Sequence, residues 1–135
     1  MSLVISPALA EARVAATRDF IDLGTLPGRI RFYGNTQPAA GATPGASPLA
    51  EITLTKPCGS IADAVLTLTQ ADAGGDLILA NGAAVWARMV NGNGDFVMDG
   101  DVSDETGSGS FKVAGTTGTA LYAGGSLLLG TTALG

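Results

Sequence analysis

Residues 49–55 read LAEITLT, in which apolar side chains alternate with polar ones. Alternation with a period of two places the apolar side chains on one face of a β-strand and the polar side chains on the other. The same pattern occurs in GRIRFY at 28–33 and in AVLTLT at 64–69. Strands with one apolar face and one polar face are typical of antiparallel sheets, so these segments predict antiparallel pairing.

Further segments of this composition follow, and Gly, Pro, Asn and Asp separate them. They are DLILAN at 76–81, AAVWARMV at 83–90, DFVMD at 95–99, SFKV at 110–113 and LYAGGSLLL at 121–129. About eight short strands predict a mainly β protein with residues 1–135 in a single domain. The favoured architecture is an antiparallel β-sandwich of jelly-roll type, and a closed barrel is the alternative.

One helix is expected before the strands. Ser6 followed by Pro7 is typical of a helix start. An apolar side chain then recurs at spacings of three and four, at Leu9, Ala12, Ala16, Phe20 and Leu23. This spacing predicts that these five side chains form the packed face of the helix. Since Gly24 ends the helix and Pro27 prevents its continuation, residues 1–26 form a short N-terminal helix and lead-in.

Residues 34–48, GNTQPAAGATPGASP, form a long connection that opposes both helix and strand. Irregular loops of this length are uncommon inside compact domains unless they have a role. Two interpretations stay open: an extended arm that lies across a neighbouring subunit, or a floppy surface loop.

An acidic stretch, VNGNGDFVMDGDVSDETGSGS, covers residues 90–110. Its acids are Asp95, Asp99, Asp101, Asp104 and Glu105. An EF-hand loop needs Gly at its sixth position and Glu at its twelfth, and neither register that starts at Asn91 or Asp99 provides them. Turn chemistry explains the stretch better, with turns at NGNG 91–94 and DG 99–100 and a polar connection at DETGSG. An irregular calcium site and a catalytic carboxylate pair are the weaker alternatives.

Several catalytic classes are excluded by composition. The chain has no His and one cysteine, Cys58, so it lacks a histidine-activated nucleophile, an intrachain disulfide and the usual zinc ligands. Cys58 is expected to be a small buried thiol. No glycine-rich segment has the ending of a phosphate-binding loop. We therefore expect no enzyme activity and no cofactor.

Charge limits the partners. The net charge is −5, and the 7 basic residues are scattered, which argues against nucleic-acid binding. Charged residues make up 14% of the chain, against about 25% in average proteins. A surface with few charges loses little hydration free energy when another subunit covers it, so the composition favours a subunit of an assembly. No segment predicts a membrane span or a secretion signal.

Three motifs in order resemble a group of small proteins from the structural gene clusters of tailed phages and prophages. They are LPGRIRFYGNTQPAAG, LAEITLTKPCGS and ANGAAVWARMVNGNGDFVMDGDVS, and the resemblance covers about residues 1–113. It implies a virion structural protein, a head decoration or cement protein that clamps capsid subunits, often as a trimer. Cys58 stands where the group usually has an aromatic residue. The resemblance carries no catalytic residues.

The leading hypothesis is therefore a virion protein, assembled in the bacterial cytoplasm, that associates with itself and with the major capsid protein or a tail protein. A tail-associated carbohydrate- or calcium-binding module is the alternative, and a glycan-cleaving enzyme is the third. The interface candidates are Arg29, Arg31, Tyr33, Gln37, Pro38, Pro44, Trp86 and Arg88. Trp86 with Arg88 could instead belong to the core and its edge, and this interpretation is favoured.

Overall fold

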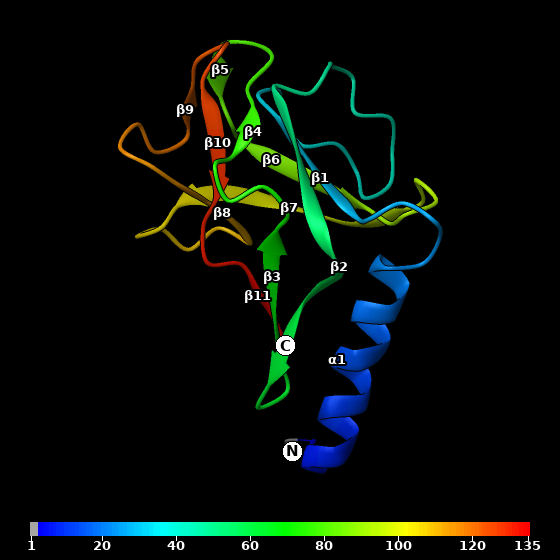
Figure 1. Ribbon diagram of the computed structural model, residues 1–135. Coiled ribbons are helices and arrows are strands. Elements are labelled where there is room, and N and C mark those ends of the chain that lie inside the picture. Colours follow the sequence, from blue (N-terminus) through cyan, green and yellow to red (C-terminus); the bar gives the residue numbers. More distant parts are fainter. Residues whose placement is uncertain (1–2) are drawn as a thin grey trace.

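The computed structural model describes residues 3–135 and contains one helix and a large curled sheet (Figure 1). The helix is α1 (Pro7–Ile21), and the first strands are β1 (Arg29–Tyr33), β2 (Ala50–Ala62), β3 (Val65–Gln70), β4 (Asp76–Leu77), β5 (Gly82–Ala83) and β6 (Trp86–Val90). The remaining strands are β7 (Phe96–Asp104), β8 (Phe111–Ala114), β9 (Ala120–Leu121), β10 (Ser126–Leu129) and β11 (Ala133–Leu134). The mainly β class with one N-terminal helix is confirmed.

The sheet contains nine strands in the order β11-β3-β2-β1-β6-β7-β8-β10-β4, and β5 pairs separately with β9. All pairs are antiparallel except β7 with β8, which run parallel in the register Val102↔Phe111. The expectation of a purely antiparallel sheet is therefore wrong at this pair. The chain turns back between Asp104 and Phe111 without adding a strand, so β8 enters the sheet in the same direction as β7.

The two ends of the sheet approach each other, which gives it a curled, sandwich-like form. Ile78, next to β4, bridges Ala50 in β2. Gln70, at the end of β3, donates from Nε2 to the carbonyl oxygen of Leu127 (2.9 Å) and to Oδ2 of Asp76 (2.8 Å), and its Oε1 accepts from the N–H of Leu129 (2.9 Å). One side-chain amide thus connects three strands that are not all neighbours in the sheet.

The apolar side chains of the alternating segments are the ones buried in the core, as predicted. In β1, Ile30 and Phe32 are fully buried, and in β2, Ile52 and Leu54 are buried in the same way. Aliphatic residues of the other strands and Phe111 complete one continuous apolar cluster. Burial of alternate side chains is the expected consequence of a sheet with one face inward.

Two strands are longer than predicted. β2 continues through Pro57 and Cys58 to Ala62, with a register shift between Leu54 and Gly59. β7 runs through Asp99 and Gly100, so the predicted turn at DG 99–100 is wrong. The other predicted turns are confirmed: residues 91–94 connect β6 to β7, with the Gly94 N–H donating to the Asn91 carbonyl oxygen (2.9 Å), and residues 105–110 connect β7 to β8.

Helix α1 begins and ends with defined contacts. Ser6 is its N-cap, because Oγ accepts from the N–H of Leu9 (3.1 Å), and Pro7 follows at the first helical position. At the other end, Nζ of Lys56 in β2 donates to the carbonyl oxygens of Asp22, Gly24 and Leu26 at 2.5, 2.7 and 3.2 Å. The ammonium group thus binds the carbonyl oxygen of the C-cap Asp22 and two carbonyl oxygens of the segment that follows the helix.

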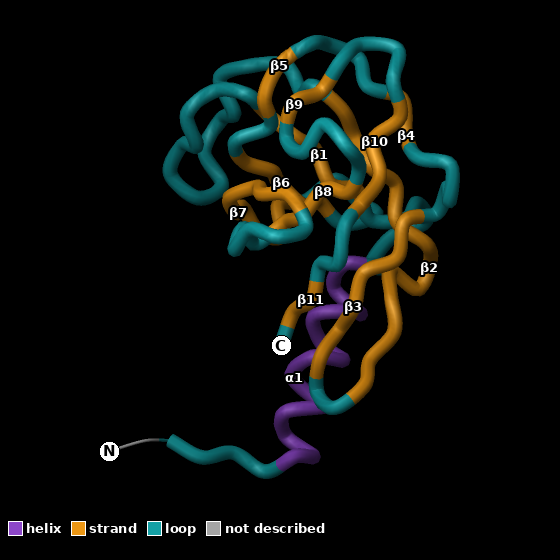
Figure 2. The backbone as a smooth tube through the Cα atoms, turned by 90° about the vertical axis from the view of Figure 1, so that its left-hand side faces the viewer, coloured by secondary structure: helices purple, strands orange, loops and turns teal. Residues whose placement is uncertain are grey.

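The packed face of α1 differs from the prediction. Val14 and Ile21 are buried against β2 and β3, whereas Leu9, Phe20 and Leu23 are 48%, 45% and 49% exposed. Figure 2 shows α1 beside the hairpin of β2 and β3, with its N-terminal half extending away from the main body. The stripe at Leu9, Ala12, Ala16, Phe20 and Leu23, called the α1 stripe below, therefore faces outward. Its last member, Leu23, lies two residues beyond the end of the helix at Ile21, so the helix is shorter than predicted.

Candidate association surfaces

The five acids of the stretch 90–110 do not form one site. Asp99 pairs with Arg88, and Glu105 accepts from the N–H of Thr131. Asp101 accepts from the N–H (2.9 Å) and Oγ (3.0 Å) of Ser110, and these hydrogen bonds lower the pKa of its carboxyl. Across residues 3–135, no three acidic or cysteine side chains gather closely enough to hold a metal ion.

Asp104 and Asp95 have local roles in turns. The carboxylate of Asp104 accepts from Oγ1 and the N–H of Thr106 and from the N–H of Gly107, and these bonds lower its pKa. The N–H of Asp95 donates to Oδ1 of Asn91, which closes the turn between β6 and β7. The contacts of the Asp104 carboxylate and of the Asp95 backbone are those of turn chemistry.

The interface candidates Tyr33, Trp86 and Arg88 lie inside the chain, with exposed fractions of 3%, 0% and 8%. The rings of Tyr33 and Trp86 stack with centroids 4.4 Å apart, and the Arg88 guanidinium lies 5.4 Å from the Trp86 ring and 5.3 Å from the Phe96 ring. Because these three residues are covered, they offer no free surface to a partner. They form a second packed layer on the outer face of β1, β6 and β7.

The loop over residues 34–48 covers this layer. Arg88 donates to both carboxylate oxygens of Asp99 (2.7 and 3.0 Å) and to the carbonyl oxygen of Ala42 (2.6 Å). Asn35 accepts from the indole N–H of Trp86 (2.9 Å) and donates to the carbonyl oxygen of Pro44 (2.7 Å). These hydrogen bonds hold the loop against its own sheet, so it is not a floppy surface loop, and an arm that lies across a neighbouring subunit stays a prediction.

The remaining interface candidates do not form one surface, because they lie in the loop over residues 34–48 and in β1. Gln37 is exposed, and Pro38 and Pro44 are half-buried in the same loop. Arg31 pairs with Glu51 across β1 and β2 (2.7 Å), with both side chains about one-third exposed. Arg29 is half-buried, and its Nε has no hydrogen-bond partner among the described residues.

Cys58 is fully buried in β2. Burial raises the pKa of its thiol to about 12, and the neighbouring carboxylate of Asp22 adds to this rise. Burial also raises the pKa of Asp22 itself, partly offset by a hydrogen bond from the N–H of Cys58 and by the charge of Lys56. A thiol with so high a pKa carries almost no thiolate at neutral pH, so Cys58 is unsuited to nucleophilic chemistry.

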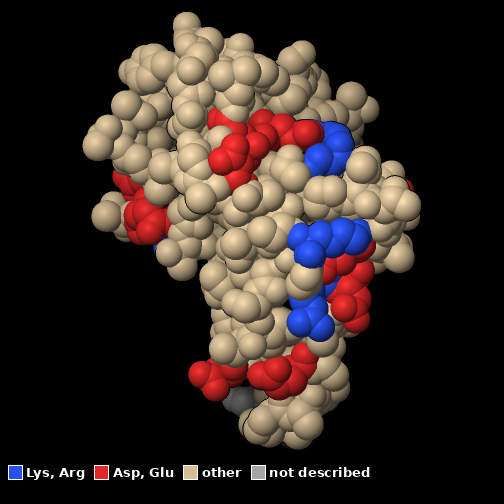
Figure 3. All heavy atoms as spheres, in the orientation of Figure 1, with Lys and Arg blue, Asp and Glu red and all other residues tan. Residues whose placement is uncertain are grey.

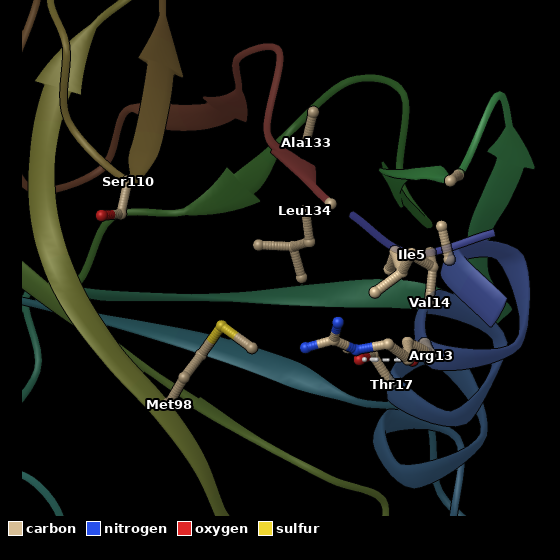
Figure 4. A pocket seen from close by; sticks show the side chains of 11 residues that line it. Ile5, Arg13, Val14, Thr17, Met98, Ser110, Ala133 and Leu134 are labelled. Atoms are coloured by element: carbon tan, nitrogen blue, oxygen red, sulfur yellow. Dashed lines mark hydrogen bonds between the residues drawn. The ribbon is translucent and has the colours of Figure 1, made fainter. Parts of the chain in front are cut away.

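A groove of about 730 Å³ separates α1 from β7 and β11 (Figure 4). Val14, Met98 and Leu134 are among its apolar lining residues, and Arg13 is its charged one. Figure 4 shows the side chains of Arg13, Met98 and Leu134 pointing towards the same space. The side chain of Arg13 makes no ion pair with any residue of 3–135.

Exposed apolar side chains concentrate at two ends of the molecule. At one end lie the α1 stripe and the lead-in, where Leu3 and Val4 are 91% and 87% exposed. At the opposite end, segments 77–85 and 114–126 lie side by side through the pairing of β5 with β9 and contain no charged residue. We call these two segments the uncharged cap. Figure 3 shows this end free of acidic and basic side chains on the face in view.

The uncharged cap also carries large exposed side chains. Leu77, Leu79 and Tyr122 are 61%, 62% and 60% exposed. Hydrogen bonds fix its backbone, including Ala123 N–H to Asn81 Oδ1 (2.8 Å) and Gly124 N–H to the carbonyl oxygen of Ile78 (2.9 Å). Sequence reasoning missed this surface, although the lack of charge in both segments was a visible signal.

Comparison with protein families, with curated proteins and with solved structures finds no match for this chain. In the part of the chain that the structure describes, no helix is long and apolar enough to cross a bilayer.

Proposed function

We propose that this chain is a structural protein of a tailed-phage virion that decorates the capsid by protein–protein association. The observation that carries the proposal is the uncharged cap, where Leu77, Leu79 and Tyr122 stand exposed in a region without charge. Exposed apolar groups on fixed backbone, with no charge to dehydrate, are features of protein-binding surfaces.

The dispersed acids and the buried thiol also favour association over catalysis. The carboxylates of Asp99, Asp101, Asp104 and Glu105 are engaged within the chain, and Cys58 is covered. The motifs of residues 28–113 resemble phage structural proteins, and this resemblance is the reason for proposing a virion and, as partner, the major capsid protein. Many identical weak contacts on one shell add up to stable attachment.

Binding to shells tests the proposal. Labelled protein is mixed with empty heads, and in parallel with tails, of the phage or prophage whose structural genes encode the chain, and is then sedimented. We expect saturable binding to heads, with a ratio to capsid subunits that reports whether it binds as a trimer. Failure to bind either heads or tails would contradict the proposal. Binding to tails alone would contradict capsid decoration and indicate a tail protein instead.

Matched variants locate the contact. Leu79→Glu places a charge on the uncharged cap, and we expect it to weaken binding at least tenfold because the charge must lose its water. Val4→Glu, at the opposite end and also exposed, is the control and should bind like the wild type. Equal binding by the two variants would exclude the cap as the contact surface.

A further inference from the structure

Asparagine stands directly before glycine at three places in this chain, namely at Asn81, Asn91 and Asn93. Such a pair can react internally, because Gly has no Cβ to obstruct its own backbone nitrogen as that nitrogen approaches the Asn side chain. The reaction also requires the Asn side chain and the Gly backbone to move towards each other. The fold restrains the three pairs to different degrees, so they differ in their capacity to react.

Asn91 is the most firmly held of the three. Its side chain is fully buried, and its Oδ1 accepts from the N–H groups of Asn93 and Asp95, both at 3.0 Å. Gly92, which follows it, is buried as well, and a Cβ at Gly92 would lie 2.1 Å from the carbonyl oxygen of Leu26. Neither partner of this pair has room to move.

Asn81 is exposed but anchored in the uncharged cap. Its Oδ1 accepts from the N–H of Ala123 (2.8 Å). Gly82, which follows it, belongs to β5 and pairs with Leu121 of β9. Rotation of the side chain would break the hydrogen bond to Ala123, and movement of Gly82 would separate the two strands.

Asn93 has the greatest freedom. It is exposed, and within residues 3–135 only its backbone N–H makes a hydrogen bond, whereas its side chain lies against the backbone of Gly24. Gly94 has a φ of +86°, and no described atom lies within 4 Å of the position that a Cβ would take there. One hydrogen bond, from the Gly94 N–H to the Asn91 carbonyl oxygen (2.9 Å), has to open before the pair can react.

We propose that Asn93 is a site of spontaneous covalent modification, at which the side-chain amide becomes a carboxylate. The backbone nitrogen of Gly94 forms a bond to Cγ of Asn93 and gives its proton to water. The bond between Cγ and Nδ2 breaks and ammonia leaves, which produces a cyclic imide. One water molecule then adds to either ring carbonyl and opens the ring, and the product is aspartate or isoaspartate. The reaction consumes water alone and transfers no electrons.

The products differ from the original chain in charge and in backbone length. Each adds one negative charge to a chain whose net charge is −5. In isoaspartate the main chain runs through Cγ, so the turn gains a methylene group in its backbone. The hydrogen bond between Gly94 and Asn91 then loses its geometry, and the connection between β6 and β7 becomes looser. The proposal does not depend on capsid binding, because this turn lies outside the uncharged cap.

Incubation of the native protein at neutral pH over several weeks tests the proposal, with ion exchange to separate charge variants and mass spectrometry of peptides to locate the change. We expect an acidic species that contains aspartate and isoaspartate at position 93. Asn81 should convert at least about fivefold more slowly, as a hydrogen bond of ordinary strength implies, and Asn91 more slowly still. In urea that unfolds the chain, the three sites should convert at similar rates. Native rates at Asn81 or Asn91 that equal the rate at Asn93, or an unchanged ranking in urea, would overturn the proposal.

Two glycine variants test the chemical step. Gly94→Ala should slow conversion of Asn93 by about tenfold or more, because a Cβ obstructs ring closure. Strain from Ala at this φ would loosen the turn and speed the reaction, so a slower rate reports on ring closure itself. Gly124→Ala is the matched control, since Gly124 has a φ of +89°, an equally open Cβ position and no preceding Asn. It should convert at the wild-type rate, and equal rates for the two variants would contradict the proposed attack by Gly94.

Discussion

Arg88 holds the loop over residues 34–48 to the sheet because one guanidinium group serves several partners. It pairs with Asp99 through two hydrogen bonds, binds the carbonyl oxygen of Ala42 and lies between two aromatic rings. The hydrogen bonds to Asp99 raise the pKa of Arg88 further, so it stays charged at every accessible pH. The buried carboxylate depends on this single cation.

Removal of Arg88 should therefore be costly. We expect Arg88→Met to lower the free energy of unfolding by about 3–5 kcal/mol, because Asp99 is left charged and buried. Urea denaturation measures this loss. Arg31→Met, which breaks the partly exposed pair with Glu51, is the control and should cost about 1 kcal/mol or less. Adding Asp99→Leu to Arg88→Met should restore part of the loss, and no recovery would argue against an unpaired carboxylate as its cause.

Cys58 gives a second prediction at this scale. With its thiol buried and its pKa raised to about 12, native protein should resist a thiol reagent at pH 8 and react only as fast as it unfolds. Absorbance of the released thiolate reports the rate, with and without urea. A variant with an exposed cysteine, Ala8→Cys, should instead label one cysteine at once. Rapid labelling of the wild type would show that β2 opens locally.

At the scale of elements, α1 shows what periodicity can and cannot predict. The helix itself follows from Ser6, Pro7 and the recurring apolar residues. Its orientation does not, because α1 has two apolar faces: Val14 and Ile21 on one, and the α1 stripe on the other. The stripe is longer in sequence, yet the shorter face is the one that fits against β2 and β3. Periodicity identifies apolar faces but not the partner that covers each.

The segment at Asp99 and Gly100 shows the same limit. Asp-Gly is a strong hairpin signal, yet here it lies within β7 because both residues have long-range roles. Asp99 pairs with Arg88, and a Cβ at Gly100 would meet the Ser110 and Phe111 side chains at 2.8 and 3.0 Å. Gly100 is thus explained by close packing rather than by a turn, which sequence alone could not distinguish.

The turn between β2 and β3 carries a testable strain. Asp63 and Ala64 both have positive φ, at 52° and 60°, where a Cβ costs about 1 kcal/mol or more. We expect Ala64→Gly to raise the free energy of unfolding by about 0.5–1 kcal/mol, because Gly adopts this conformation without a clash. The hydrogen bond from the N–H of residue 64 to Glu11 (2.7 Å) should persist.

Ala62→Gly, in the neighbouring strand, is the control for this turn and should destabilise by about 0.5–1 kcal/mol. Thermal and urea denaturation of both variants separate the two effects. Equal destabilisation by the two changes would show that the turn is not strained in solution.

At the scale of the whole molecule, the sequence predicted the class and most strands but not their order. Alternation in residues 28–33, 49–55 and 64–69 determines which side chains are buried, and these segments became β1, part of β2 and β3. The parallel pairing of β7 with β8 and the backbone bridge between Ile78 and Ala50 depend on the path that the chain takes between the strands. No local pattern encodes such contacts. The candidate surfaces were predicted only in part, since the α1 stripe was expected to be core.

The pH dependence of stability combines two opposite contributions. The pKa of Asp101 is lowered by its hydrogen bonds, so its contribution is present above the usual value of 3.8 and is lost as pH falls through the folded pKa. The pKa of Asp22 is raised by burial, so its neutral form favours the fold. That contribution is lost as pH rises from 3.8 through the raised folded value.

We therefore expect Asp101→Asn to be less stable than wild type at pH 7, by less than about 1 kcal/mol because the group is exposed, with the difference vanishing in strong acid. Asp22→Asn should be more stable than wild type at pH 7 and equal to it below pH 3.8. Urea midpoints from pH 2.5 to 8 check both curves, spanning the ordinary range of carboxyl titration. If both variants changed stability at pH 7 in the same direction, the hydrogen bonds of Asp101 and the burial of Asp22 could not be the causes of the two pKa shifts.

The Gln70 amide has a consequence for ageing. Its nitrogen donates to a carbonyl and to a carboxylate at the seam where β3, β4 and β10 meet. Slow deamidation would replace that nitrogen with oxygen, and two attractive contacts would become repulsive ones, one of them with Asp76. Chemical loss of a single ammonia at this position would therefore loosen the seam that holds both ends of the sheet together.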